Sequence, residues 1–226
     1  MKTVALILAA GPYRRGWKEQ RPKQLALIEN QPLILRTLGQ LQERGLDDVV
    51  VITHNKKIKE ATPRHFEPKA NRWWTETLLS TQELWSDRTM IVNGDTVYSN
   101  EAMNMLAEES RPLTFIGDMA KVHVELLVFT KDRHDLVVHA AEVATAEAER
   151  RQAEPLDKRW KTAHMQGFMA MHWAFYGTLA GLPIVYPAKR MYSPKIHRLL
   201  SRGDYTFDVD SVVLYERFLV RNPWAR

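Results

Sequence analysis

The stretch Val4-Ala5-Leu6-Ile7-Leu8-Ala9-Ala10-Gly11 opens the chain with a continuous apolar run that ends in small residues. A run that is apolar at every position is typical of a strand buried on both faces of a parallel sheet. Met1-Lys2-Thr3 before it superficially resembles the start of a signal peptide. The apolar run is short, however, and Pro12-Tyr13-Arg14-Arg15 follows almost at once. The pattern therefore favours a buried first strand over a leader.

Helical and strand patterns alternate after this run. The apolar spacing of Leu33 to Leu46, which has Gly45 near its end, predicts a helix. The further predictions are a strand over Asp48 to Thr53, a helix over Thr75 to Trp85 and a strand over Thr89 to Val92. Pro63 and Pro68 interrupt the pattern between them and predict a surface excursion over residues 56–72. Such alternation produces a parallel sheet with right-handed crossovers.

The second half of the chain has a less regular pattern. Strands are predicted over Leu113 to Ile116, Val122 to Phe129 and Pro183 to Tyr186, and helices over Glu101 to Glu108, Asp132 to Gln152 and Ser211 to Val220. Residues 160–182 are rich in Met and aromatic side chains, and their pattern predicts no single element. Because there is no internal repeat, low-complexity stretch or linker, we expect residues 1–226 to form one domain.

Composition excludes several classes of function. The 226 residues include no cysteine, which rules out disulfides, thiolate zinc sites and a cysteine nucleophile. The 32 basic and 27 acidic residues give a mild excess of +5, which suits phosphorylated small molecules, and the aromatic residues are not interleaved with basic ones as in an RNA-binding surface. No apolar segment is long enough for a membrane-spanning helix. We therefore expect a soluble, cytoplasmic protein that binds neither nucleic acid nor membranes.

The loop from Gly11 to Lys23 is rich in Gly, Pro, Arg and Lys. A loop that leaves the carboxyl end of a central parallel strand borders the ligand crevice of the sheet. The small residues Ala9, Ala10 and Gly11 let backbone amides approach a phosphate or a base closely, and Arg15 and Lys23 would bring two cations to a triphosphate. An ordinary solvated basic loop is the alternative.

Leu8-Ala9-Ala10-Gly11, Arg15 and Pro22-Lys23-Gln24-Leu25 together resemble the signature of the nucleotidyltransferases that make nucleotide-activated sugars and alcohols. That pattern reads roughly Leu-Ala-Ala-Gly-x-Gly-x-Arg, a short spacer, then Pro-Lys-x-Leu. Tyr13 stands where the pattern has its second glycine, and the spacer is about one residue longer than in many members. Either Arg14 or Arg15 can therefore be the catalytic arginine, and Arg15 fits the pattern. Asn30-Gln31-Pro32-Leu33-Ile34 is similar to the family's Gly-x-Pro-Leu-Ile.

Two acidic motifs extend the resemblance. Asn93-Gly94-Asp95 resembles the family's Gly-Asp, and Phe207-Asp208-Val209-Asp210-Ser211 is similar to its acidic-Ile-Asp-Ser/Thr motif. The resemblance implies that Asp95 and Asp210 hold Mg²⁺, with Asp208 as a neighbouring support. A carboxylate at the carboxyl end of a strand is well placed to hold a cation that bridges phosphate oxygens. The alternative is that these residues only cap helices or favour turns.

The resemblance also implies a fold and a set of site residues. The fold is α/β, a Rossmann-like nucleotide-diphospho-sugar transferase fold of the GT-A type, in which a mainly parallel twisted sheet is flanked by helices and residues of about 110–200 bind the acceptor. Arg15 and Lys23 are the implied catalytic residues, and Lys189 and Arg190 are candidates for the acceptor phosphate. The nucleotide-binding candidates are Leu8, Ala9, Ala10, Gly11, Arg14, Arg15, Lys23, Thr77 and Gly94, although Thr77 fits an ordinary helical threonine better.

The implied reaction transfers a nucleoside monophosphate from a nucleoside triphosphate to a small phosphorylated acceptor, with release of pyrophosphate. The acceptor is either an alcohol phosphate such as phosphocholine or a sugar 1-phosphate. One competitor is a GT-A glycosyltransferase with a nucleotide-sugar donor. Such enzymes commonly carry an Asp-x-Asp motif in mid-chain, and Asp95 has no second aspartate at that spacing, which disfavours this alternative. The other is a non-catalytic nucleotide-sensing module that keeps the first loop without binding metal. His164 and His172 fit core or surface histidines better than metal ligands, and Trp73-Trp74 fits a packed pair.

Overall fold

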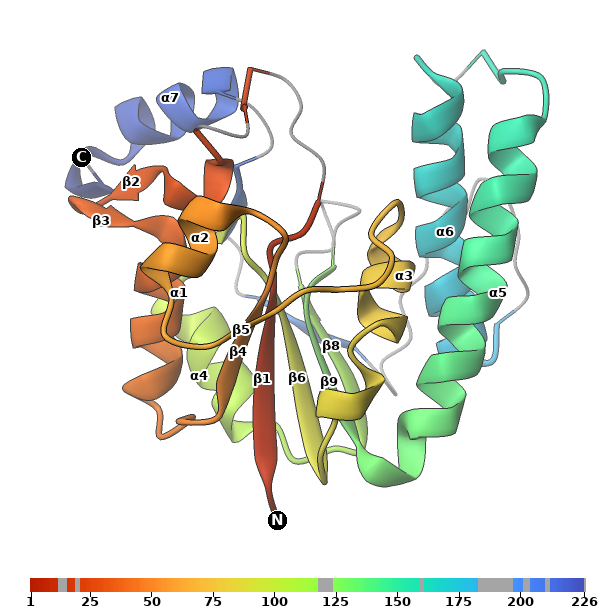
Figure 1. The fold of residues 1–226 in the computed structure, drawn as a ribbon, viewed down its shortest axis with the longest axis horizontal. Helices are drawn as coiled ribbons and strands as arrows, with labels where there is room; N and C mark the ends of the chain where they lie inside the picture. Colours follow the sequence, from red (N-terminus) through yellow and green to blue (C-terminus); the bar gives the residue numbers. More distant parts are fainter. Residues whose placement is uncertain are drawn as a thin grey trace.

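The computed structural model describes residues 1–11, 16–18, 21–117, 124–158, 161–182, 197–200, 204–209 and 212–225. Its main sheet has seven strands in the order β10-β8-β9-β6-β1-β4-β5 (Figure 1). Strand β9 runs antiparallel to both of its neighbours, and every other pair in this sheet is parallel. The strands are β1 (Thr3–Leu8), β4 (Val49–Ile52), β5 (His65–Phe66), β6 (Arg88–Asn93), β8 (Leu113–Gly117), β9 (Val124–Thr130) and β10 (His197–Leu199). The predicted mainly parallel α/β sheet is confirmed.

Strand β1 is central because its side chains are buried on both faces of the sheet. Val4, Leu6 and Leu8 pack into one apolar cluster, while Ala5 and Ile7 pack into the other. Helices α3 (Trp74–Leu79), α5 (His134–Ala153) and α6 (Ala163–Ala180) cover the first face, and α1 (Leu33–Gln42), α2 (Lys56–Ala61) and α4 (Asn100–Glu108) cover the second (Figure 1). Two covered faces explain why the strand is apolar at every position.

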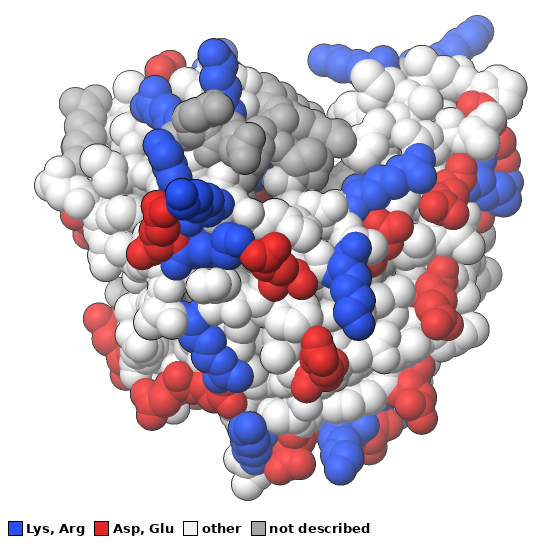
Figure 2. Space-filling view, in the orientation of Figure 1, with Lys and Arg blue, Asp and Glu red and all other residues white. Residues whose placement is uncertain are grey.

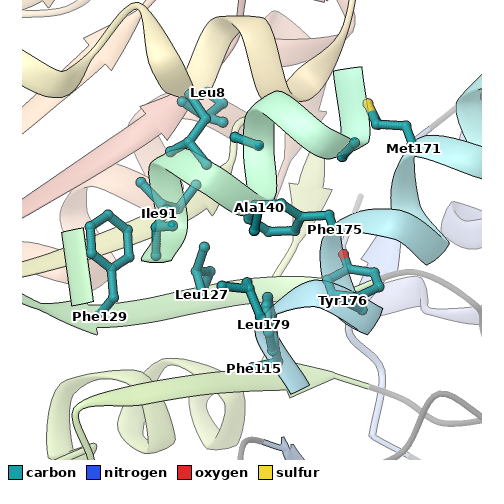
Figure 3. Close-up of a cluster of buried hydrophobic side chains, with 14 of the residues drawn as sticks. Leu8, Ile91, Phe115, Leu127, Phe129, Ala140, Met171, Phe175, Tyr176 and Leu179 are labelled. Atoms are coloured by element: carbon teal, nitrogen blue, oxygen red, sulfur yellow. The ribbon is translucent and has the colours of Figure 1, made fainter. Parts of the chain in front are cut away.

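Residues 163–180, for which the sequence predicts no element, form helix α6. The Thr162 side chain caps its first turn by accepting a hydrogen bond from the Met165 amide at 3.1 Å, and Gly181 ends it with a left-handed φ of 65°. Phe175 and Leu179 pack on the sheet beside Phe115 (Figure 3). Because α6 is apolar on most of its circumference, it shows no amphipathic spacing in the sequence.

Helices α5 and α6 form an antiparallel hairpin that needs a glycine at its contact. A Cβ atom on Gly167 would lie 2.7 Å from the Ala148 carbonyl oxygen and 2.9 Å from the Trp73 ring. Separations this short do not occur for real Cβ atoms, so only glycine lets α6 approach both α5 and the start of α3. The position of the hairpin is therefore tied to that of Trp73.

The predicted surface excursion over residues 56–72 is instead partly regular. It contains α2, whose first turn the Asn55 side chain caps by accepting from the Ile58 amide at 3.2 Å, and β5, which pairs with β4 at the sheet edge. Pro63 and Pro68 flank β5 on either side. The prolines delimit this short edge strand, which is a position where proline is tolerated.

A third apolar cluster lies beyond the ends of the central strands. It joins Trp17, Val97, Val209 and Phe218 under helix α7 (Val212–Arg221). Two short antiparallel pairs belong to this region: β2 (Leu27–Ile28) with β3 (Gln31–Pro32), and β7 (Thr96–Val97) with β11 (Phe207–Asp208). Single 3₁₀ turns occupy Lys23–Leu25, Gln82–Leu84, Lys131–Arg133 and Pro223–Ala225.

The hairpin between β2 and β3 turns at two residues with left-handed backbones. Glu29 has φ 54° and Asn30 has φ 61°. Two-residue hairpins of this hand favour Asn or Gly because both residue types accept a positive φ more readily than most. Asn30 can therefore occupy the position where the signature has glycine. Among the described helices, none combines the length and the apolar character that a membrane crossing requires.

Glu109 closes helix α4 with a buried carboxylate that holds the far edge of the sheet. Arg111 donates two hydrogen bonds to it, at 3.0 and 2.8 Å, and the Arg198 guanidinium of β10 lies 3.6 Å from the same carboxylate. Burial acts to raise the pKa of Glu109, but the hydrogen bonds and charge of Arg111, with the charge of Arg198, outweigh it and lower the pKa to about 2.

We predict that Glu109→Gln lowers the free energy of unfolding at neutral pH by about 2 kcal/mol, because it leaves two guanidinium groups without their counter-charge. Since the pKa in the folded state lies below its usual value of 4.5, the stabilisation is complete above that value and is lost as the pH falls toward about 2. Urea unfolding across this range measures the difference. A gap between the two proteins that stays constant with pH would contradict the assignment.

Candidate functional site

The carboxyl ends of β4, β1 and β6 meet side by side at one edge of the sheet. Leu8 is in register with Ile52 on one side and with Asn93 on the other. The Gly94 amide donates to the Leu8 carbonyl oxygen at 2.8 Å, which carries the pairing one residue beyond β6. The first loop and the Asn93-Gly94-Asp95 motif are therefore neighbours, as parallel strands with ligand-binding loops at their carboxyl ends require.

Gly94 leaves little room for a side chain. A Cβ atom there would lie 3.0 Å from both the Ala9 Cβ atom and the Leu8 carbonyl oxygen, and 3.2 Å from the Ile34 side chain. A side chain there would require the neighbouring atoms of β1 or α1 to shift by a few tenths of an ångström. The glycine of this motif thus sets the spacing between Ala9 and Asp95.

Lys23 and Asp95 form an ion pair at this edge of the sheet, between the Lys23 Nζ and the Asp95 Oδ2 atoms. Their side chains are only 14% and 23% exposed, so solvent screens their attraction less than that of a surface pair. Lys23 comes from the 3₁₀ turn after buried Pro22, and Asp95 follows β6. The structure therefore brings the predicted catalytic lysine and the predicted metal ligand into contact.

The C-terminal acidic motif lies beside Asp95. Strand β11 pairs with β7, which places Asp208 opposite Thr96, and the Val209 amide donates to the Asp95 carbonyl oxygen at 2.8 Å. The segment is further held because Asp204 accepts hydrogen bonds from the Ser99 hydroxyl and the Thr206 amide. Residues separated by more than 100 positions in the chain are thus joined next to the ion pair.

Asp210 follows Val209 in the chain but lies outside the described residues, as do Arg14 and Arg15 of the first loop and Lys189 and Arg190 of the second half. Their roles stay predictions. Among the described residues, no group of three or more His, Asp or Glu side chains is placed to hold a metal ion. The chemistry of Asp95 nevertheless fits a metal cation, because carboxylate oxygens are the ligands that Mg²⁺ takes and this carboxylate already pairs with the Lys23 ammonium group.

Thr77 lies in α3 and is nearly fully buried. Its hydroxyl donates to the Trp73 carbonyl oxygen at 3.4 Å, within the helix. This contact is typical of a helical threonine, the alternative that the sequence favours. A nucleotide-binding role for Thr77 stays a prediction.

The tryptophan pair packs between α3, α6 and the end of β6. The Trp73 ring stacks on His164, with 4.7 Å between ring centroids. The Trp74 indole meets Phe175 edge to face at 5.3 Å and donates to the Asn93 Oδ1 atom at 3.2 Å. Trp74 therefore links the α5–α6 hairpin to the residue beside the Gly94-Asp95 motif.

A hollow lies at the end of the molecule toward which β1 points. Figure 2 shows it beside the α5–α6 hairpin, which rises past the strand ends in Figure 1. Charges of both signs are interleaved on the face shown in Figure 2. The hairpin forms one wall at the same edge of the sheet as Asp95, a location suited to a second substrate.

Sequence reasoning missed two polar residues that contact the first loop. The Thr53 hydroxyl donates to the Ala9 carbonyl oxygen at 3.2 Å, and the Asn71 side-chain amide donates to the Ala10 carbonyl oxygen at 3.0 Å. Thr53 was open to detection, because it directly follows the apolar strand β4 at its carboxyl end. Nothing in the local pattern around Asn71 indicates its distant partner.

The model of the MobA-like NTP transferase domain matches residues 5–203, which is most of the chain. The chain therefore belongs to the MobA-like NTP transferase family, and the predicted nucleotidyltransferase resemblance is confirmed. Its general activity, the transfer of a nucleotidyl group, follows from this membership. A comparison with curated protein sequences finds no match.

Solved structures agree with this fold. A CTP:phosphocholine cytidylyltransferase from Streptococcus pneumoniae (LicC) has a TM-score of 0.60 at 16% identity, with 96% of this chain and 97% of that chain covered. A nucleotidyl transferase from Methanothermobacter has a TM-score of 0.59 at 15% identity, covering 97% and 99% of the two chains. HddC from Yersinia pseudotuberculosis gives 0.53 at 10% identity, covering 98% and 99%. At these identities the likeness establishes the predicted nucleotide-diphospho-sugar transferase fold alone.

We predict that Gly94→Ala lowers the free energy of unfolding by about 1–3 kcal/mol, because the added methyl group overpacks the contact with Ala9 and Leu8. Gly39→Ala is the matched control, since a Cβ atom at Gly39, inside helix α1, meets nothing within 4 Å. Thermal unfolding of both variants measures the effect, and the control is expected to be neutral or slightly stabilising. Equal melting temperatures for Gly94→Ala and the wild type would show that this contact is not tight.

Proposed function

We propose that this protein is a magnesium-dependent nucleotidyltransferase. It transfers a nucleoside monophosphate from a nucleoside triphosphate to the phosphate of a small phosphorylated acceptor and releases pyrophosphate. Membership of the NTP transferase family supports the reaction class. The assignment of residues rests on the ion pair of Lys23 and Asp95 at the carboxyl ends of β1 and β6.

The nucleotide would bind over Ala9 to Arg15, where β1 passes into the first loop. Ala9 and Ala10 are buried, and their small side chains add little bulk where β1 passes into the first loop. Gly11 is exposed, and among the described residues no atom lies within 4 Å of a Cβ atom at this position, which is compatible with a ligand there. Lys23 lies at the same edge of the sheet, where its ammonium group would balance triphosphate charge.

Magnesium would be held by Asp95 and, by the resemblance of the C-terminal motif, by Asp210. A bound magnesium ion would neutralise phosphate charge and orient the triphosphate. The hydrogen bond from Val209 to the Asp95 carbonyl oxygen supports this pairing, because it joins the two motifs beside the carboxylate. Lys23 compensates the negative charge of Asp95, so this partly buried carboxylate keeps a counter-charge.

In the reaction, an oxygen of the acceptor phosphate forms a bond to the α-phosphorus in line with the leaving group. The bond from the α-phosphorus to the oxygen that bridges to the β-phosphorus breaks, and its electron pair leaves with pyrophosphate. The acceptor oxygen is already an anion, so it needs positioning rather than a covalent protein intermediate. Lys23 and Arg15 would stabilise the charge that grows on the leaving group.

For the acceptor we propose a small alcohol phosphate such as phosphocholine, or a sugar 1-phosphate. The solved structure of the phosphocholine cytidylyltransferase from Streptococcus pneumoniae covers nearly all of this chain, which supports this size class. The acceptor would enter the hollow beside the α5–α6 hairpin (Figure 2), within the proposed acceptor-binding portion of residues 110–200. Lys189 and Arg190 are proposed to hold its phosphate.

A pyrophosphate-release assay tests the function, using each common nucleoside triphosphate with a panel of alcohol phosphates and sugar 1-phosphates in the presence of magnesium. A nucleoside triphosphate that binds the native state raises its melting temperature by mass action, so thermal shifts select the nucleotides to assay. Binding without turnover on any acceptor would favour the nucleotide-sensing module. Glycosyl transfer from a nucleotide sugar would favour the glycosyltransferase.

We predict that Asp95→Asn lowers kcat by roughly 10³-fold, because it removes the charge that holds the metal against the phosphates. Asp87→Asn is the control: Asp87 lies just before β6, at the opposite end of the strand, where it accepts a hydrogen bond from the Lys2 amide at 2.8 Å. Steady-state pyrophosphate release measures both variants. Full magnesium-dependent activity of Asp95→Asn would refute the site as assigned.

For Lys23→Gln we expect kcat/KM for the nucleotide to fall by roughly 10²-fold, since the variant loses a cation that contacts the triphosphate and its leaving group. Lys18→Gln is the matched control, because Lys18 is exposed in the same loop. Steady-state kinetics with the nucleotide as the varied substrate measures the change. An equal effect of the two substitutions would mean that only the overall charge of the loop matters.

A further inference from the structure

The backbone at the end of β1 is held by side chains from two different segments. Thr53, after β4, donates its hydroxyl hydrogen to the Ala9 carbonyl oxygen at 3.2 Å. Asn71, before α3, donates an amide hydrogen to the Ala10 carbonyl oxygen at 3.0 Å. Consecutive peptide groups of the first loop are therefore fixed by donors that are far apart in the chain.

These two hydrogen bonds also set the direction of two amides. In a trans peptide the carbonyl oxygen and the following amide hydrogen point in opposite directions. The bond from Thr53 to the Ala9 carbonyl therefore turns the Ala10 amide away from Thr53, and the bond from Asn71 to the Ala10 carbonyl turns the Gly11 amide away from Asn71. In the part of the chain that the structure describes, neither amide has a hydrogen-bond acceptor.

The residues that follow Asn71 contact the α5–α6 hairpin. The next residue, Arg72, donates to the Gln152 side chain at 2.6 Å and lies 3.5 Å from the Glu149 carboxylate, both on α5. Trp73 then stacks on His164 of α6. The α5–α6 hairpin thus fixes the segment that carries Asn71, and Asn71 fixes the first loop.

We propose that Asn71 is a positioning residue that aims the Gly11 amide at the bound nucleoside triphosphate, with Thr53 doing the same for the Ala10 amide. This inference rests on the proposed function, because the two amides need an acceptor that the nucleotide supplies. It also connects the α5–α6 hairpin to the nucleotide, because Arg72 contacts α5 and the preceding residue, Asn71, contacts the first loop.

The test replaces Asn71 with Leu, which branches at the same carbon atom but has no polar hydrogen to donate. We expect the Kd and the KM for the nucleoside triphosphate to rise about tenfold, the equivalent of one hydrogen bond, while the KM for the acceptor stays unchanged. Asn71→His is expected to restore nucleotide affinity, because an imidazole nitrogen can donate from nearly the same place. Titration calorimetry and steady-state kinetics measure these values.

Asn222→Leu is the matched control. Asn222 also donates a side-chain amide hydrogen to a backbone carbonyl, that of Phe218, at the same 3.0 Å and in a half-buried place. It follows helix α7, and its side-chain hydrogen bond is made to the last turn of that helix rather than to the backbone at the end of β1. Its loss should cost similar stability without changing the nucleotide KM, which separates positioning from a general structural effect.

The inference is overturned if Asn71→Leu binds the nucleotide as tightly as the wild type, or if Asn222→Leu weakens binding equally. If Asn71→Leu does not fold, Thr53→Val decides the question, because it removes the other donor with little change of shape and is expected to raise the nucleotide Kd. If the wild-type protein turns over nucleotide, and Asn71→Leu and Thr53→Val both have its nucleotide Kd and KM, this inference alone is rejected. A wild-type protein that binds no nucleoside triphosphate would reject the proposed function together with it.

Discussion

The close approach of β6 to β1 at Gly94 is the constraint on which the rest of the site depends. The Gly94 amide reaches the Leu8 carbonyl oxygen because no side chain stands between the two strand ends. This contact sets Asp95 beside the first loop, where Lys23 can pair with it. An α/β sheet places its ligand at such strand ends since the loops there meet without a covering helix.

Elements from both ends of the chain converge on this point. The first loop, the residues after β6 and the segment after β11 belong to three distant parts of the sequence, and the pairing of β11 with β7 joins the last of them to Asp95. Loop closure over such distances costs entropy that only a packed structure repays. The apolar cluster of Trp17, Val97, Val209 and Phe218 supplies this packing directly beneath the motif.

Much of the fold follows from the sequence because its periodic patterns are local. The run from Val4 to Ala10 predicts a central strand, and strands β4, β6, β8 and β9 with helices α1, α4, α5 and α7 all lie where their patterns predict them. Helix α6 escapes prediction because it is apolar on most of its surface, and β5 escapes because it is only two residues long. Both gain their stability from tertiary contacts rather than from local preference.

The sequence by itself determined which residues carry charge, and it predicts which of them could bind a metal, since the motifs around Gly11, Lys23 and Asp95 are short and their side chains have intrinsic properties. It also determined the parallel sheet, through the alternation of strand and helix patterns. Only the tertiary structure decided that Lys23 pairs with Asp95, that Val209 binds the Asp95 carbonyl and that Asn71 holds the Ala10 carbonyl. A hydrogen bond or ion pair between segments so far apart has no local signature, because its geometry exists only once the intervening chain has folded.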